Sequence, residues 1–389
     1  MVTRHAPGPI EKLVQQDTNS DNQALRRGWT TGSCATAAAK AAFSALQDGH
    51  FPDPVTITLP RGGQVAFALA EAGFEQDAAE VGVVKDAGDD PDVTHGALIR
   101  ARVRLLPAGS GIRFRAGEGV GTITRPGLAL PPGEPAINPV PRQMIRDALQ
   151  EIAGGISPDA EVTLSVPGGE KLAERTLNGR LGIVGGLSIL GTTGIVVPFS
   201  CAAWIDTIRR GIDVARAMSI EHVAGSTGNV SELAVQALHG MPDVALIEMG
   251  DFAGGLLKYL RDHPVPRVTV AGGVAKMTKL AQGRLDLHSK RGSADLVALA
   301  AVATEAGGNT DLGKSIIQAN TVAQAFTLSS AAGVALGDAI AWRAWSVAAE
   351  VLRGTGTSLE IVLFDREGAL VGRTDFTSVD AVHSRNRLR

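Results

Sequence analysis

A run of four aspartates is the first candidate for acid–base chemistry in this sequence. Asp86, Asp89, Asp90 and Asp92 fall within seven residues, directly after Lys85. Carboxylates this close repel one another, so at least one is expected to have a raised pKa and to serve as an acid or a base. Asp86 is our first choice for a catalytic base because it follows the end of a predicted strand. The spacing does not match a calcium-binding EF-hand loop, and a solvated turn is the competing interpretation.

Three glycine-bearing turns follow three predicted strands in the second half of the chain. In a parallel sheet such turns lie at one edge, where ligands bind, and the helices that begin there offer backbone N–H donors. Glu248 and Asp251 could accept hydrogen bonds from a ribose diol, although helix capping and solvation explain both acids equally well. The predicted contacts to a cofactor are Gly225, Thr227, Gly228, Glu248, Gly250, Asp251, Gly272 and Gly273.

A cationic segment follows the third turn and would suit the anionic groups of a substrate. Six cationic or potentially cationic residues fall within sixteen positions: Lys276, Lys279, Arg284, His288, Lys290 and Arg291. A solvated basic helix face is the usual explanation of such a run. The position of the segment argues against that explanation, because Lys276 and Lys279 come directly after the glycines of the third turn.

A second anion site is predicted where Thr30, Thr31 and Ser33 open an alanine-rich helix over 33–47. Hydroxyls and N–H groups at the positive end of a helix attract anions, but an ordinary N-cap has the same sequence pattern. Cys34 at this point is either a thiol of lowered pKa or, as we favour, a small packed residue.

The elements that must position these residues fall into two patterns. Residues 25–199 carry helices at 33–47 and 142–153 and strands at 55–59, 64–71, 80–84, 98–105 and 162–166, which predicts an α+β domain. Within this domain, the segment over residues 125–142 contains six prolines and is expected to be an ordered loop or a linker. Residues 1–24 are expected to be a disordered leader.

From about residue 200, helices alternate with short apolar strands at 221–225, 244–249 and 267–271. This alternation predicts an α/β domain over 200–389 with a mainly parallel, Rossmann-like sheet flanked by helices. Helices at 294–306, 314–325 and 331–352 and a hairpin turning at Asp365 to Gly368 complete it.

The composition excludes several classes of protein. A net charge of −3 over 389 residues provides no global field for nucleic acid or a membrane, and an aromatic share of 4% argues against stacking platforms for single strands. Two cysteines and the absence of a signal peptide or membrane span predict a cytoplasmic protein. Homo-oligomerisation stays open.

Several of these segments together resemble the cobalt-precorrin-5B C1-methyltransferase family. The resemblance includes RRGWTTGSCA at 26–35 and KDAGDDPDVT at 85–94, and it continues at 117–122, 132–141, 181–194, 249–252, 279–283 and 288–289. The family normally has tyrosine or a similar residue where Trp29 stands. The matching blocks occur in order from about residue 25 to about residue 290.

The resemblance implies transfer of a methyl group from S-adenosylmethionine to C1 of cobalt-precorrin-5B, which gives cobalt-precorrin-6A. Cobalt would arrive in the substrate, so no metal site of the protein is expected. The carboxylate arms of the corrin precursor would be held by Thr30, Thr31, Ser33, Lys85, Lys276, Lys279, Arg284, His288 and Lys290. The alternative is a non-catalytic tetrapyrrole-binding or hand-off protein. A nucleotide-dependent oxidoreductase is disfavoured because the dinucleotide fingerprint is missing.

Overall fold

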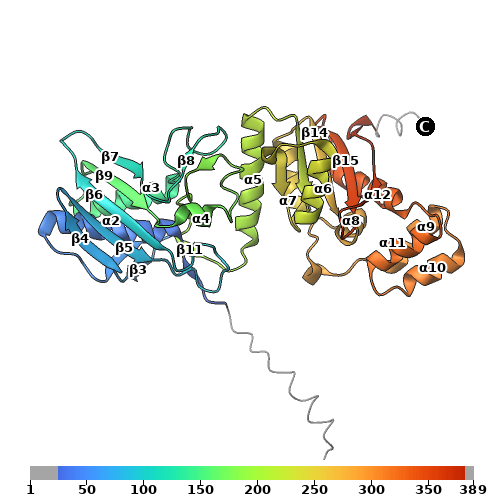
Figure 1. Ribbon diagram of the computed structural model, residues 1–389, viewed down its shortest axis with the longest axis horizontal. Coiled ribbons are helices and arrows are strands. Elements are labelled where there is room, and N and C mark those ends of the chain that lie inside the picture. Colours follow the sequence, from blue (N-terminus) through green and yellow to red (C-terminus); the bar gives the residue numbers. More distant parts are fainter. Residues whose placement is uncertain (1–24, 382–389) are drawn as a thin grey trace, which may run out of the picture.

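A computed structural model describes residues 25–381, except for the side chain of Lys290, and shows two bodies joined through helix α5 (Cys201–Ala217; Figure 1). The predicted leader over 1–24 lies outside the described residues. Within 25–381, no helix is long and apolar enough to cross a membrane.

The first body is built on a five-stranded sheet. Its strands, in spatial order, are β4 (Glu71–Glu75), β5 (Ala78–Val84), β6 (Leu98–Leu105), β9 (Ala160–Ser165) and β7 (Ile112–Ala116). Neighbouring strands are antiparallel except β7 and β9. The side chains of β6 alternate between two faces, and Ile99, Ala101 and Val103 on one face are fully buried. The arginines on the other face pair with acids of β4, two strands away, and of the adjacent β9.

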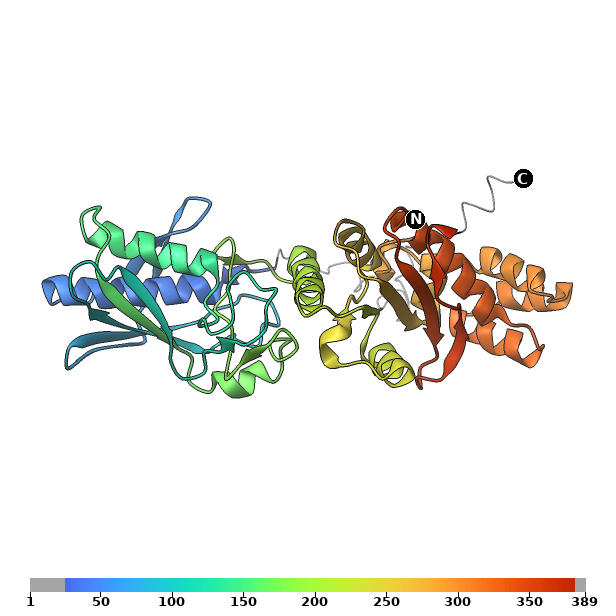
Figure 2. The ribbon, with the colours of Figure 1, turned by 90° about the horizontal axis from the view of Figure 1, so that it is seen from above.

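Helix α2 (Thr31–Asp48) packs on this sheet beside α3 (Pro139–Ile152), as Figure 2 shows. Every residue of α2 from Thr31 to Ala45 is buried, and its alanines allow close packing against β5 and β6. Smaller elements complete the body: the hairpin of β2 (Val55–Thr58) and β3 (Gln64–Phe67), the pair β1 (Gly28–Trp29) and β11 (Ile195–Val196), the pair β8 (Thr122–Ile123) and β10 (Ile183–Val184), and helix α4 (Gly169–Ala173).

The second body is built on a mixed sheet. Four strands are parallel, in the order β13 (Leu246–Glu248), β12 (His222–Ser226), β14 (Arg267–Gly273) and β15 (Ser358–Phe364), and β16 (Leu370–Arg373) and β17 (Thr377–Ser378) pair antiparallel to β15. The hairpin predicted at 365–368 is confirmed, and it is what makes the sheet mixed.

Helices cover both faces of this sheet. Val223 and Val270 face a core shared with α5, α7 (Ala253–Asp262), α8 (Val274–Ala281) and α12 (Leu336–Val351), whereas Ala224 and Ala271 face α6 (Asn229–His239). Helices α9 (Leu296–Glu305), α10 (Thr310–Ile317) and α11 (Val322–Ala331) extend the first of these cores, and short 3-10 turns occur at η1 (Asp243–Ala245) and η2 (Ser289–Arg291).

The two bodies are packed together by a small apolar cluster. Ile123, Leu181 and Ile183 of the first body contact Val214 of α5 and Val244 of η1. All five side chains are buried. The joint between the bodies is therefore a packed interface and not only a single covalent connection.

Several boundaries differ from the predictions. The strand predicted at 64–71 is two strands, β3 and β4, and β7 was missed. The helix predicted at 314–325 is wrong, because Thr321 caps the start of α11 by accepting a hydrogen bond from the Gln324 N–H (3.1 Å) and so separates it from α10. Residues 125–138 of the proline-rich segment form an ordered loop, and α3 already begins at Pro139. Arg142, in the first turn of α3, donates to the carbonyls of Ile137 (2.8 Å) and Pro135 (3.0 Å) of this loop.

Candidate functional site

The carboxyl ends of β12, β13 and β14 meet at one edge of the second sheet, as the sequence predicted. Ser226 lies opposite Glu248 on one side and Ala271 on the other. The Ser226 carbonyl accepts from the N–H groups of Met249 (2.9 Å) and Gly250 (3.1 Å), and the Ala271 carbonyl accepts from that of Thr227 (3.0 Å). Residues 226–228, 248–251 and 271–273 therefore form one continuous surface, which we call the sheet edge.

Two glycines of the sheet edge leave open space for a ligand. At Gly228 and at Gly273, a Cβ atom would meet no other atom within 4 Å. These residues are the N-caps of α6 and α8, so free N–H groups of the first turns of both helices are close to that space. The geometry of these two positions agrees with the predicted close approach of a ligand to the backbone.

The other three glycines have structural reasons of their own. A Cβ at Gly225 would lie 2.3 Å from the Leu256 side chain, and one at Gly272 would lie 2.7 Å from the sulfur of Met277. These two are packing positions, and the ligand contacts predicted there stay predictions. Gly250 has a left-handed φ of 56°, and a Cβ there would be 3.2 Å from the ring of Trp204.

Polar groups at the sheet edge converge on Asp251. The Lys276 ammonium donates to the Thr227 carbonyl (2.7 Å) and lies 3.1 Å from Asp251 Oδ1. That carboxylate oxygen is buried and, despite the short distance, accepts no well-directed hydrogen bond from any residue that the structure describes. Lys276 therefore balances the charge of Asp251 and leaves the oxygen able to accept a hydrogen bond from a ligand.

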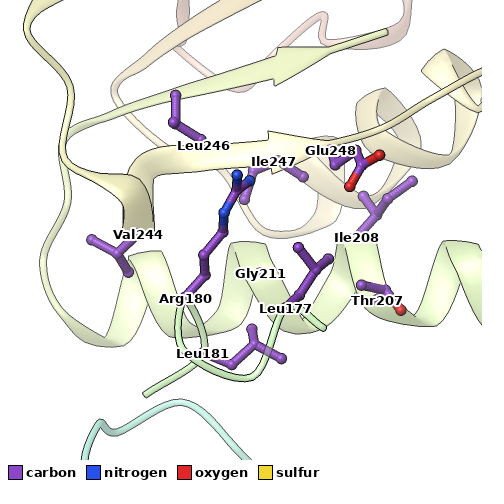
Figure 3. A pocket seen from close by; sticks show the side chains of 10 residues that line it. All are labelled: Leu177, Arg180, Leu181, Thr207, Ile208, Gly211, Val244, Leu246, Ile247 and Glu248. Carbon is purple, nitrogen blue, oxygen red and sulfur yellow. The ribbon is translucent and has the colours of Figure 1, made fainter. Parts of the chain in front are cut away.

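Glu248 lies where the sheet edge meets the first body. Figure 3 shows Arg180 reaching from the 177–181 loop of the first body toward β13, in a narrow pocket that Glu248 and the α5 residues Thr207, Ile208 and Gly211 also line. Arg180 donates to Glu232 of α6 (2.5 Å), whose other oxygen accepts from Ser226 Oγ (3.2 Å). Burial, and then the nearby Glu232 carboxylate, raises the pKa of Glu248, and Arg180 opposes the rise.

The aspartate run does not have the electrostatics that we predicted. Asp86 accepts hydrogen bonds from both terminal nitrogens of Arg26, and its Oδ1 accepts the Gly88 N–H (2.9 Å). The hydrogen bond from Arg26 is the main cause of a lowered pKa at Asp86, so the expected rise is wrong there. Repulsion among the aspartates is outweighed by pairing with a residue sixty positions earlier. Asp86 remains a predicted catalytic residue, but a carboxylate held ionised in this way is a weak base.

Lys85 is directed into the protein rather than toward a substrate. Its side chain is 2% exposed and donates to Asp92 and to the Thr94 hydroxyl. Burial alone would raise the pKa of Asp92, but the charge of Lys85 and hydrogen bonds from Lys85 and Thr94 hold it below its usual value. The Lys85 ammonium closes this loop, and the substrate contact predicted there stays a prediction.

The threonine–serine anion site is closed as well. Thr30, Thr31 and Ser33 are all buried, and Thr30 caps α2 by accepting the Ser33 N–H (3.2 Å). The Gly32 N–H donates to the Leu190 carbonyl (3.1 Å), and Ser33 Oγ donates to that of Gly194 (2.8 Å). The N-cap interpretation is thus confirmed for Thr30, and the substrate contacts predicted at Thr30, Thr31 and Ser33 stay predictions.

A packed thiol is confirmed at the following position of α2. The Cys34 side chain is fully buried, and burial raises its pKa to about 12.

The cationic segment after α8 is mostly occupied by contacts within the protein. Lys279 is buried and donates to the Leu287 carbonyl (2.9 Å), and its predicted substrate contact stays a prediction. Arg284 donates to the Arg291 carbonyl (3.2 Å), and the His288 N–H donates to Asp286 (3.1 Å). Contacts of Arg284 and His288 with substrate remain predictions, and so does that of Lys290, whose side chain is outside the description.

The first body contains a cavity that the sequence did not reveal. It has a volume of about 340 Å³ and lies between the tip of the β2–β3 hairpin and the β1–β11 pair. We call it the arginine cavity; its lining residues are Arg27, Leu59, Arg61, Gly62, Thr193, Ile195 and Val197. The pairing of β1 with β11 forms one side of it, and this pairing joins residues that are 168 (Gly28 and Val196) and 166 (Trp29 and Ile195) positions apart. No local sequence pattern predicts such a pairing.

A short segment leads from the arginine cavity to the sheet edge. Val197 lines the cavity, and two residues later the Phe199 N–H donates to Asp90 (2.9 Å). Phe199 is 69% exposed and has a left-handed φ of 55°, which is uncommon for a bulky residue. Helix α5 begins next, and its Trp204 Nε1 donates to the Glu248 carbonyl (3.2 Å). Residues 197–204 thus contact both sites.

Comparison with known proteins extends over most of the chain. A family model described as CbiD matches residues 18–198, and one described as CbiD, C-terminal domain, matches residues 286–375. A solved structure of a cobalamin biosynthesis protein (cbiD) from Archaeoglobus fulgidus is 28% identical in sequence, with a TM-score of 0.37 over 69% of this chain and 83% of its own.

Curated proteins with the name cobalt-precorrin-5B C(1)-methyltransferase are more similar. The one from Agrobacterium fabrum is 63% identical over 92% of this chain and 95% of its own length. Those from Bradyrhizobium sp. and Halorhodospira halophila are 60% and 58% identical, over 90% and 93% of this chain and 94% and 98% of their own lengths.

Proposed function

This chain belongs to the CbiD family of cobalt-precorrin-5B C(1)-methyltransferases, and we propose that it methylates C1 of cobalt-precorrin-5B with S-adenosylmethionine as donor, giving cobalt-precorrin-6A. The names of relatives that are up to 63% identical over nearly the whole chain support the substrate and the reaction. The donor and its site are supported by the chemistry of the sheet edge.

The sheet edge offers what a nucleoside with a sulfonium group needs. The observation that carries this placement is the open space at Gly228 and Gly273, on the same sheet edge as a buried oxygen of Asp251 that accepts no hydrogen bond from residues 25–381. Ribose hydroxyls can donate to Asp251 and Glu248, and a carboxylate can accept N–H donors from the first turns of α6 and α8. When bound, S-adenosylmethionine supplies an electrophilic methyl group on a cationic sulfur.

The contribution of the chain is therefore mainly to orient and to balance charge. Asp251 and Glu248 place carboxyl groups beside a cationic donor, and Lys276 prevents the uncompensated burial of Asp251. Holding donor and acceptor in line is by itself a large part of the rate enhancement of a group transfer. Asp86 remains our proposed catalytic group, with the orientation of Arg26 as the role that its ion pair supports best.

We place this reaction in the cytoplasm. Cys34 is buried and Cys201 is exposed, and both are free thiols, as in proteins from a reducing compartment.

Calorimetric titration with S-adenosylhomocysteine tests the donor site. Gly273→Val fills the open space without backbone strain, since Gly273 has φ −68° and ψ 148°, and we expect the Kd to rise at least about tenfold. Gly73→Val is the matched control, because Gly73 lies on β4 of the first body, also with no atom within 4 Å of a Cβ. Equal affinity of wild type and Gly273→Val would refute the placement, and no binding by wild type would refute the donor.

A further inference from the structure

We infer that the arginine cavity binds an edge of the tetrapyrrole substrate, with Arg27 and Arg61 holding its carboxylate arms and the apolar wall contacting the ring. This inference rests on the proposed function, because it takes from it a substrate that combines a flat conjugated macrocycle with acetate and propionate side chains. Neither arginine was among the substrate contacts that the sequence predicted.

The cations of the cavity are unused within the protein. Neither the Arg27 nor the Arg61 side chain makes a hydrogen bond or an ion pair among residues 25–381. Other arginines of the same body are committed: Arg26 pairs with Asp86, Arg100 with Glu71 and Arg142 with Glu134. Two guanidinium groups around one cavity are suited to planar, bidentate recognition of carboxylates.

The nearby aspartates do not cancel this positive charge by pairing with it. Asp86 is bound to the Arg26 side chain, Asp89 accepts the Arg26 N–H (2.6 Å), and Asp90 accepts the N–H of Phe199 (2.9 Å). Each of these carboxylates already has a partner outside the cavity lining. The two cavity guanidinium groups are therefore available to an anionic ligand.

The remaining lining suits the ring of the same ligand. Leu59, Ile195 and Val197 give the cavity an apolar wall, and Val197 is 48% exposed. Phe199, two residues further, is an exposed aromatic side chain on strained backbone, and such strain concentrates at functional sites. An apolar wall between cations matches a hydrophobic macrocycle with charged arms better than it matches a small anion or a nucleotide phosphate.

The size of the cavity limits how much of the substrate enters. A volume of about 340 Å³ is near the lower end for drug-sized ligands, which is roughly 300–1,000 Å³. One pyrrole-derived ring with its arms fits this description, and the rest of the macrocycle would lie outside the cavity. Residues 197–204 run from this cavity to Glu248 of the sheet edge, so the outer part would extend toward the donor.

Equilibrium dialysis with two stable cobalt corrins tests the assignment. Cobyrinic acid has free carboxylate arms, whereas in cobinamide these arms are amides. We expect wild type to prefer cobyrinic acid. Each of the variants Arg27→Gln and Arg61→Gln should raise the Kd for cobyrinic acid roughly three- to tenfold, a modest factor because both side chains are exposed. Val197→Asp adds a repelling charge to the wall and should weaken binding as well. Arg113→Gln, an equal charge change at an exposed position of β7, is the control.

The outcomes separate this inference from the proposed function. Wild-type affinity for cobyrinic acid in Arg27→Gln, Arg61→Gln and Val197→Asp would overturn the cavity assignment, even if S-adenosylhomocysteine still binds. An equal loss in Arg113→Gln would overturn it too, since the effect would then be one of net charge. Selective loss in the cavity variants, together with no methyl transfer by wild type, would keep the cavity and refute the methyltransferase.

Discussion

The ion pair between Arg180 and Glu232 gives the sharpest prediction on how the two bodies are joined. Arg180 belongs to the 177–181 loop of the first body and Glu232 to α6 of the second, and their contact distance is 2.5 Å. Arg180→Met keeps the aliphatic length of the side chain and removes its charge. Among residues 25–381, the Glu232 carboxylate, which is 5% exposed, would then keep only Ser226 as a hydrogen-bond donor.

The magnitude follows from the burial of the two partners. Removing one partner of a deeply buried pair costs about 3–5 kcal/mol, and an exposed pair is worth about 0–1 kcal/mol. Because the Arg180 side chain is 31% exposed, we expect an intermediate loss of about 2 kcal/mol. This corresponds to a roughly 30-fold rise in the ratio of unfolded to folded protein.

Urea unfolding followed by circular dichroism measures this loss. At a slope of ~2 kcal/mol/M the midpoint should fall by ~1 M with the slope unchanged. Adding Glu232→Gln should recover part of the stability, because the uncompensated charge is removed as well. Arg261→Met, at an exposed pair with Asp262, is the control and should leave the midpoint where it is. An unshifted midpoint in Arg180→Met would refute the buried bridge between the bodies.

Three further predictions concern single side chains. Burial, and then a neighbouring carboxylate, raises the pKa of Glu248 above 4.5 in the folded state. Because the folded state then binds the carboxyl proton more tightly than the unfolded state, the free energy of unfolding falls as the pH rises from the unfolded-state pKa through the folded-state pKa. Glu248→Gln should remove this slope from urea midpoints measured at about pH 4–7, and an unchanged slope would contradict the assignment. Lys279→Met should lower the free energy of unfolding by about 1–2 kcal/mol through loss of the hydrogen bond to Leu287, with the KM for the corrin substrate unchanged. A raised KM at wild-type stability would instead identify Lys279 as a substrate contact. Asp86→Asn should slow single-turnover methyl transfer only a few-fold if the residue orients Arg26, whereas a loss of ~100-fold or more would identify a general base.

The common edge of the three turns could be predicted from the sequence, because parallel strands alternating with helices leave little freedom in topology. What the pattern could not show was the direction in which each glycine faces. Gly225 and Gly228 lie three residues apart, yet one packs on Leu256 and the other faces open space. That difference depends on the packing of α7 against the sheet, which residue type alone does not encode.

The contacts of the charged candidates could not be predicted, because residue type does not show whether a charged side chain has a partner inside the protein. Asp86 is paired with Arg26, and Lys279 turns toward the carbonyl of Leu287. A cation on a predicted helix can equally cap a loop or face a ligand, and only the tertiary structure separates the two. The arginine cavity was missed because the pair β1–β11 brings Arg27 beside Ile195 and Val197, which are distant in the sequence.

Incubation of the purified protein with cobalt-precorrin-5B and S-adenosylmethionine carrying a ¹³C-labelled methyl group tests the central claim most directly. The account predicts one labelled methyl group on the product, bonded to C1 of the macrocycle, and release of S-adenosylhomocysteine in equal amount. Label at another ring position, or unlabelled corrin recovered after many equivalents of donor, would contradict it.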